Sequence, residues 1–239
     1  IGVDKGFGNT KGCNSIIQSG VRKLPTKPSL ETHIVEYNGE FYAVDCQKIN
    51  IQKSKTENEY TLVSTMAILG EELKRKGTNN ANIRLGVGLP LTMMGSQKSD
   101  FLSYMLRNRR LNFKYEGKFY SIYMVSVDVF PQGYAAVVDK LDKFGISTVV
   151  IDVGSWTIDI LPLVEGQPDM AKCKSLSLGT ITVMNEINEA LRQKFGQEAD
   201  EAIIKDVMIN KNSNINSAYL QVIQEGLYNY VEEIMNHLR

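Results

Sequence analysis

Residues 1–12, IGVDKGFGNTKG, combine a carboxylate, a glycine-rich turn and a lysine directly after an apolar run. Asp4 precedes Gly6 and Gly8, and Lys11 follows the second glycine. Small residues let backbone N–H groups approach phosphate oxygens, and successive N–H groups form an anion-binding concavity. A carboxylate fits such a site when Mg²⁺ lies between it and the phosphate. Residues 4–11, called the first turn below, therefore suit the binding of a phosphate with its Mg²⁺, to which the lysine adds positive charge.

Residues 149–160, VVIDVGSWTIDI, repeat this arrangement. An apolar run leads into Asp152, Gly154 follows, and a second apolar run leaves residues 152–157, called the second turn below. The two aspartates lie 152 − 4 = 148 residues apart, the length of a typical domain. One such turn is more often an ordinary hairpin than a nucleotide site, and Lys11 alone would be a solvated surface lysine. Two turns of one design favour a shared phosphate chemistry.

The sequence excludes two common phosphate motifs. No G-x-x-x-x-G-K-[ST] segment is present, which excludes the P-loop. The dinucleotide-binding fingerprint fails because Lys11 stands where its third glycine belongs and a strand pattern, not a helix, follows.

Composition limits the remaining classes. Lys+Arg and Asp+Glu both number 27, and no block of five like charges occurs, so direct nucleic-acid binding is not expected. The 3 cysteines lack any C-x-x-C spacing, which favours a reduced compartment without a zinc site. Neither a membrane span nor a signal peptide is expected from the apolar runs. Because the chain begins without Met inside an apolar segment, we expect its natural N-terminus to lie upstream.

Hydrophobic patterning predicts an α/β chain whose strands position both turns. Hairpins are predicted at Asn38-Gly39 and Glu116-Gly117, and residues 47–58 are predicted to form an exposed loop. Strands are predicted at 1–3, 13–18, 34–37, 41–44, 82–90, 149–151 and 171–176. Helices are predicted at 60–76, 96–109, 179–195 and 218–238, with another from Pro131 towards Leu141.

The segment VDKGFGNTKG resembles the first phosphate loop of the actin, heat-shock chaperone and sugar kinase superfamily, and VVIDVGSWTIDI resembles its second. Within it the chain is most similar to the bacterial actin-like plasmid-segregation ATPases, the ParM/StbA group. The segments LGVGLPLT (85–92), VFPQGYAAVV (129–138) and EADEAII (198–204) agree. The resemblance implies an actin-like (ribonuclease H-like) two-domain α/β fold with mixed sheets and crossover helices.

The same resemblance implies a domain I at residues 1–144 and the first part of a domain II at residues 145–239. Relatives continue beyond the helix that corresponds to 218–238 into a strand and a Gly-Gly-Gly turn that closes over the adenosine. We therefore expect a C-terminal segment of this kind to be missing after Arg239.

The resemblance also implies a role for individual residues. Asp4 and Asp152 would position Mg²⁺ on ATP or ADP, largely through water, and Gln132 would orient the attacking water. The residues implied to cradle the β-phosphate side are Gly6, Phe7, Gly8, Asn9, Thr10 and Lys11. Those implied to flank the γ-phosphate are Gly154, Ser155, Trp156 and Thr157. Gly179 would border the ribose and adenine, and Lys205 would reach the base pocket.

Simpler readings exist for several of these residues. Gln132 could occupy the exposed first turn of a helix after Pro131, and Lys205 could be a solvated surface lysine. Phe7 replaces a serine common in relatives, and Trp156 replaces a small residue, which makes the detailed nucleotide contacts an open question.

Three functions remain open from the sequence. The first is a slow ATPase that polymerises into filaments and moves plasmid copies through a DNA-bound adaptor protein, in the bacterial cytoplasm and without membrane contact. The second is a small-molecule kinase of the same superfamily, for which we find no carboxylate base beside a sugar pocket. The third is a degenerate nucleotide-sensing scaffold, favoured by Phe7 and Trp156.

Overall fold

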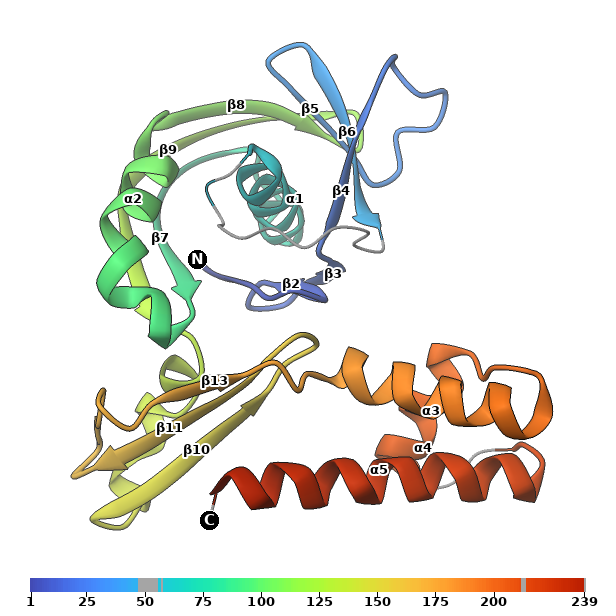
Figure 1. Ribbon diagram of the computed structural model, residues 1–239. Coiled ribbons are helices and arrows are strands. Elements are labelled where there is room, and N and C mark those ends of the chain that lie inside the picture. The colour runs from blue at the N-terminus through green and yellow to red at the C-terminus, as the bar shows by residue number, and fades with distance from the viewer. Residues whose placement is uncertain (47–55, 57, 212–213, 239) are drawn as a thin grey trace. The chain divides into compact units, whose positions relative to one another are not determined.

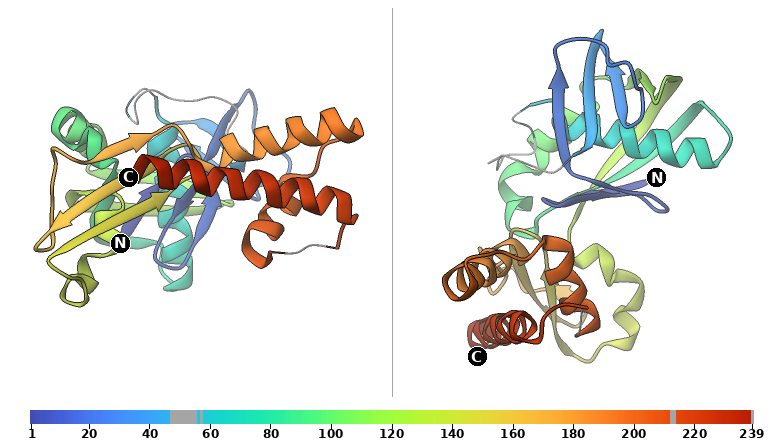
Figure 2. Two further views of the ribbon diagram at one scale, coloured as in Figure 1. Left: turned by 60° about the horizontal axis from the view of Figure 1, so that its bottom comes forward. Right: turned by 90° about the vertical axis from the view of Figure 1, so that its right-hand side faces the viewer.

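The computed structural model describes residues 1–46, 56, 58–211 and 214–238 (Figures 1 and 2). The predicted loop at 47–58 therefore lies almost entirely outside the described residues. The chain divides into two compact units. The first is Ile1–Asp152 with Asp159–Lys174, and the second is Val153–Ile158 with Ser175–Arg239.

Within the described residues, the first unit contains a nine-stranded mixed sheet. In order of pairing, its strands are β3 (Ile16–Gln18), β2 (Asn9–Lys11), β1 (Gly2–Lys5), β7 (Asn80–Leu89), β9 (Lys118–Pro131), β8 (Arg110–Tyr115), β5 (Ile34–Tyr37), β6 (Glu40–Cys46) and β4 (Gly20–Leu24). Strand β7 runs parallel to β1 and to β9, and the other pairs are antiparallel. The first turn thus joins the central part of this sheet to its β3 edge.

Local turn chemistry explains the two predicted hairpins, and both are confirmed. Asn38 and Gly39 have φ of 53° and 78°, and Glu116 and Gly117 have φ of 50° and 75°. Two consecutive positive φ values give the turn whose twist matches that of the flanking strands. Asparagine and glycine tolerate this conformation best, which is why the first pair was a strong sequence signal.

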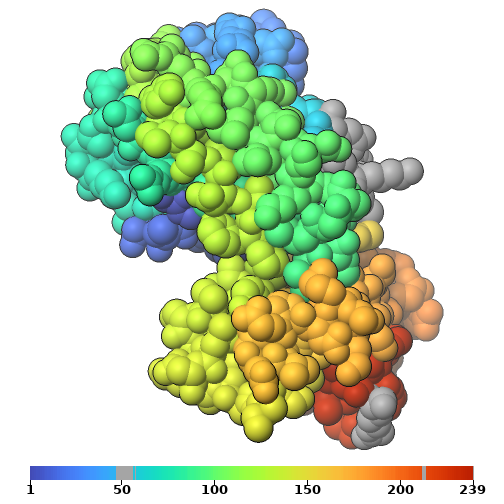
Figure 3. Space-filling view, turned by 90° about the vertical axis from the view of Figure 1, so that its left-hand side faces the viewer, coloured from blue at the N-terminus to red at the C-terminus, as the bar shows by residue number. Residues whose placement is uncertain are grey.

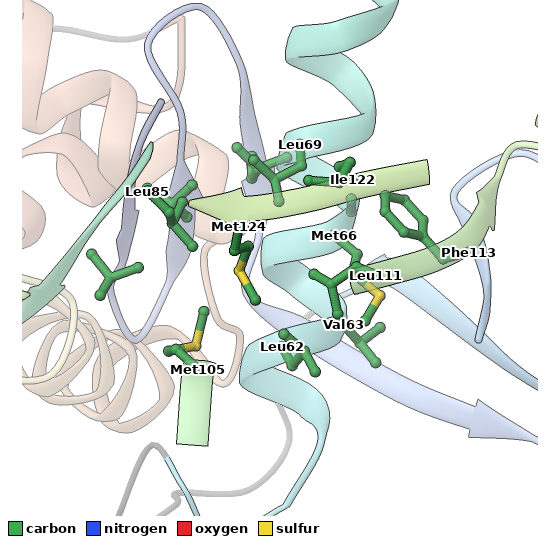
Figure 4. Close-up of a cluster of buried hydrophobic side chains, with 14 of the residues drawn as sticks. Leu62, Val63, Met66, Leu69, Leu85, Met105, Leu111, Phe113, Ile122 and Met124 are labelled. Carbon is green, nitrogen blue, oxygen red and sulfur yellow. The ribbon is translucent and has the colours of Figure 1, made fainter. Parts of the chain in front are cut away.

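The core of the first unit lies between helix α1 (Tyr60–Arg75) and the curved sheet. In Figure 4, Leu62, Val63, Met66 and Leu69 of α1 point towards apolar side chains of β7, β8 and β9. Burying one such side chain contributes about 1.5–3 kcal/mol. Helix α2 (Met94–Leu106) follows the short helix η1 (Leu91–Met93) and packs on β9. Figure 3 shows α2 and the end of β9 on one face of this unit.

Two sequence predictions in this unit are wrong. The predicted strand at 13–18 is only β3, because β1 pairs with a closer strand, β2, and a tight turn at 12–15 separates the two. The predicted helix after Pro131 is replaced by the end of β9 and two 3₁₀ helices, η2 (Tyr134–Ala136) and η3 (Val138–Lys143). Gly133, with φ of 73°, turns the chain out of the strand in a conformation that no right-handed helix accepts.

A second sheet carries the second turn. Its strands are β10 (Ser147–Val153), β11 (Ile158–Val164), β12 (Gln167–Pro168) and β13 (Lys174–Leu176), and both β12 and β13 pair with β11. The second unit adds the helices α3 (Thr180–Phe195), α4 (Glu201–Asn210) and α5 (Ser217–Leu238). Figures 1 and 2 show α3 and α5 side by side. None of the described helices has the length and apolar character needed to span a membrane.

Candidate functional site

The first turn is a tight hairpin formed by the end of β1, residues 6–8 and β2. Asp4 pairs with Lys11 and Lys5 with Thr10, and the Gly6 N–H donates to the Asn9 carbonyl at 2.9 Å. Directly opposed residues in an antiparallel pair share one face of the sheet. Asp4 and Lys11 therefore share the more open face, whereas Lys5 and Thr10 are buried on the other. The hairpin presents a carboxylate and an ammonium group together.

Gln132 directly follows β9 and contacts Asp4, which lies 128 residues earlier in the sequence. Its backbone N–H donates to the Leu89 carbonyl at 2.9 Å, which extends the pairing of β7 with β9 by one residue. Its side-chain amide donates to Asp4 Oδ1 and, at 3.4 Å, to the Lys5 carbonyl. Because the amide nitrogen serves these acceptors, the amide oxygen remains the acceptor end of the side chain.

Asp152 is the last residue but one of β10 and is half-buried. Burial raises the pKa of its carboxyl above the ordinary value, the charges of Asp159 and Asp4 raise it further, and Lys11 opposes the shift. A carboxylate that is desolvated beside other carboxylates gains from a nearby cation. Asp4 and Asp152 therefore fit Mg²⁺, which proteins hold through one or two carboxylates together with phosphate oxygens and water.

The second turn is anchored by the start of α3. The N–H groups of Gly179, Thr180 and Ile181 donate to the carbonyls of Trp156, Gly154 and Ser155 at 3.1, 3.0 and 3.0 Å. The first N–H groups of a helix have no partner within the helix, so here the turn supplies their acceptors.

Gly179 allows this close approach. A Cβ at position 179 would lie 2.3 Å from the Trp156 carbonyl carbon and 2.4 Å from its nitrogen. The predicted site residue Gly179 thus lies against the second turn. The turn itself is closed by a bond from the Gly154 N–H to the Thr157 carbonyl at 2.9 Å.

Lys205 lies on α4 and is exposed. It forms an ion pair with Glu201, one helical turn earlier, at 2.5 Å. This contact is the one expected of a surface lysine, and its role in a base pocket stays a prediction.

A comparison with known protein families identifies the family of this chain. The model for the N-terminal domain of actin-like proteins matches residues 2–134, more than half of the chain. The chain belongs to the actin-like protein family. The family and the fold class predicted from the sequence are therefore confirmed.

Solved structures share the fold of this actin-like chain. Ta0583, an archaeal actin homologue, matches 100% of this chain and 81% of its own length, with a TM-score of 0.79 and 18% identity. ParM of Bacillus thuringiensis with AMPPNP matches 99% and 81%, with a TM-score of 0.70 and 14% identity. The filament structure of AlfA from the B. subtilis plasmid pLS32 matches 83% and 80%, with a TM-score of 0.60 and 18% identity. No curated protein sequence gave a significant match.

The structure adds to this actin-like site one residue that the sequence analysis did not single out. A Cβ at Gly88 of β7 would lie 2.8 Å from Gln132 Cγ and 2.9 Å from Asp4 Oδ1. A Cβ at position 88 would force the Gln132 or Asp4 side chain to shift, so glycine here lets the two side chains meet over β7. The sequence feature that could have indicated Gly88 is the pair of alternating glycines in LGVGLP, which places Gly86 and Gly88 on one face of the strand.

Proposed function

We propose that this actin-like chain binds ATP with Mg²⁺, hydrolyses it slowly to ADP and phosphate, and polymerises into filaments that segregate plasmids. The observation that carries the proposal is the contact of the Gln132 amide with Asp4 at a glycine-rich hairpin. This contact supports the proposal because it holds the neutral amide of Gln132 against Asp4, the carboxylate that we propose to hold the metal. Family membership supports nucleotide binding, as do the AMPPNP-bound ParM and an ADP complex of Ta0583. The AlfA and Alp12 filament structures support self-association.

In this proposal Asp4 and Asp152 hold the metal largely through water. When bound, Mg²⁺ would neutralise charge on the phosphate oxygens. The backbone of the first turn, with Lys11, binds the β-phosphate side, and the second turn flanks the γ-phosphate. Gln132 orients the attacking water through its amide oxygen and is too weak a base to remove a proton. Positioning of this kind is what phosphoryl transfer requires of a protein.

The finer assignments belong to the same proposal. Gly179 borders the ribose and adenine, and Lys205 reaches the base pocket. Residues 1–144 and 145–239 form two actin-like domains. The filament acts in the bacterial cytoplasm through a DNA-bound adaptor protein, without direct contact with nucleic acid or membrane.

Light scattering together with phosphate release tests the proposal. With ATP and Mg²⁺, scattering should rise above a critical protein concentration, and phosphate should appear afterwards. Gln132→Ala should polymerise but release phosphate about 10²-fold more slowly, the size of effect expected for a lost positioning group. Gln193→Ala, an exposed glutamine on α3, is the matched control and should behave as the wild type.

Two results would contradict the proposal. Tight ATP binding without any rise in scattering would exclude nucleotide-driven polymerisation. Conversion of ATP to ADP only when a small-molecule acceptor is added, without free phosphate, would identify a kinase instead.

A further inference from the structure

A cluster of buried polar groups lies beneath the first turn, on the side away from Asp4 and Lys11. Its centre is Ser19, which is 2% exposed and lies between β3 and β4. The Ser19 N–H donates to the Gly8 carbonyl at 2.9 Å, and its hydroxyl donates to the Gly6 carbonyl at 2.8 Å. Both glycines of the turn are therefore held by one residue.

The same residue has two more contacts. Its hydroxyl oxygen lies 2.9 Å from the hydroxyl of Thr10, and its carbonyl accepts from the Lys5 ammonium at 3.3 Å. Because the single hydroxyl proton of Ser19 serves Gly6, Thr10 is the donor in the contact between the two hydroxyls. Thr10 is 0% exposed, so this network is shielded from water. Hydrogen bonds in such surroundings are costly to break.

These contacts fix the orientation of two peptide planes. In a trans peptide the C=O of one residue and the N–H of the next point in opposite directions. With the Gly6 and Gly8 carbonyls directed at Ser19, the N–H groups of Phe7 and Asn9 point to the other side of the turn. Phosphate binding by a glycine-rich turn depends on the direction of its N–H groups.

We propose that Ser19 is a positioning residue for phosphate binding, which holds the backbone of the first turn in its phosphate-binding orientation without touching the nucleotide. The inference rests on the proposed function, because it requires the first turn to bind the β-phosphate. Its distinctive consequence is selectivity among ligands. Loss of the hydroxyl weakens the binding of ligands that carry a β-phosphate and leaves the binding of ligands without one unchanged.

The test compares the binding of MgADP and AMP to the full chain by isothermal titration calorimetry. Ser19→Ala should weaken the binding of MgADP about tenfold, the effect of one lost hydrogen bond, and change the affinity for AMP less than about twofold. Ser64→Ala is the matched control, since Ser64 is 0% exposed and its hydroxyl donates to the Tyr60 and Thr61 carbonyls in α1. It removes an equally buried hydroxyl and should leave both affinities unchanged.

A second pair covers the case in which Ser19→Ala does not fold. Ser19→Thr and Ser19→Val have nearly the same shape and differ in the hydroxyl, so the threonine variant should bind MgADP about tenfold more tightly. If wild type and folded Ser19→Ala bind MgADP equally well, or if Ser19→Thr and Ser19→Val do, the role of Ser19 is overturned while the proposed function stands. Equal losses for MgADP and AMP would do so as well. A wild-type chain that binds no MgADP would overturn the proposed function and this inference together.

Discussion

Glu72 of α1 is a buried carboxylate whose replacement should destabilise the first unit strongly. It is 2% exposed and accepts three hydrogen bonds from the tight turn between β2 and β3. The donors are the Asn14 N–H at 2.7 Å, the Asn14 side-chain amide at 3.1 Å and the Ser15 hydroxyl at 2.9 Å. Gly12 permits the contact, because a Cβ there would lie 2.8 Å from a Glu72 carboxylate oxygen.

The magnitude follows from these three bonds. A hydrogen bond to a charged acceptor contributes about 1.5–3 kcal/mol, and a buried donor that loses its partner costs about 1–3 kcal/mol. Asn14 is exposed and Ser15 is half-buried, so water can satisfy part of what Glu72→Ala leaves behind. We expect a loss of about 3 kcal/mol for this variant. Glu72→Gln keeps one acceptor oxygen but turns an NH₂ group towards a donor, and should lose roughly 1–3 kcal/mol.

The stabilisation should also depend on pH. Burial acts to raise the pKa of Glu72, but the bonds from Asn14 and Ser15 and the charge of Arg75 outweigh it and hold the pKa below its ordinary value. Between the native and the unfolded pKa the unfolded state therefore binds more protons. The contribution is complete above the unfolded pKa, about 4.3, and is lost as the pH falls through the native pKa.

Urea unfolding at several pH values measures this contribution. The difference between wild type and Glu72→Gln should be constant from neutral pH down to about pH 5 and shrink at lower pH. Glu201→Gln is the matched control, because Glu201 is exposed and pairs with Lys205 at the surface. It should cost less than about 1 kcal/mol. A Glu72→Ala variant as stable as this control, or a difference that grows as the pH falls, would refute the reasoning.

Three further substitutions test the site directly. Gly88→Ala puts a methyl group against the Gln132 side chain and should lower the rate of phosphate release at least about tenfold. Its control is Gly95→Ala on α2, where the added methyl group meets open space. This control should raise the free energy of unfolding by about 0.5–1 kcal/mol and leave the rate of phosphate release unchanged. Gly179→Ala places a methyl group within contact distance of the backbone of the second turn and should destabilise the chain by more than about 2 kcal/mol in urea unfolding, because backbone cannot yield as a side chain does. Asp152→Asn removes a carboxylate whose pKa is raised by burial, so at neutral pH it should raise the thermal midpoint of the nucleotide-free chain, while the added stabilisation by ATP with Mg²⁺ disappears.

Local features of this chain were predictable because their physics is local. Asn38-Gly39 dictates a hairpin through the φ values that it accepts, and the periodic apolar residues of 60–75 dictate a helix through the face that they bury. The helix expected after Pro131 failed for a reason of the same kind. A helix-compatible composition was overridden by Gly133 and by the ladder bond from Gln132 to Leu89, which keeps the chain in the sheet.

Contacts over long sequence distances were not predictable from patterns. Nothing near Gln132 in the sequence indicates that its amide meets Asp4, and Gln132 was singled out only through a family resemblance. Gly88, Ser19 and Glu72 have ordinary local contexts, and each matters because of a partner at least 13 residues away in the sequence. Such partners are chosen by sheet pairing and helix packing, which single-sequence periodicity does not encode.

The two glycine turns share a sequence design but are supported in different ways. The first is held from beneath by a side chain, the Ser19 hydroxyl, and the tight turn that follows β2 is fixed to α1 through Glu72. In the second, the first N–H groups of α3 donate to the carbonyls of the turn, and the absence of a side chain at Gly179 allows this contact. The support of the first turn can be removed by deleting one hydroxyl group, whereas the support of the second is disturbed by adding a side chain at Gly179. The repeat in the sequence is therefore a repeat of the strand, the aspartate and the glycine, and each turn depends on its own surroundings for its shape.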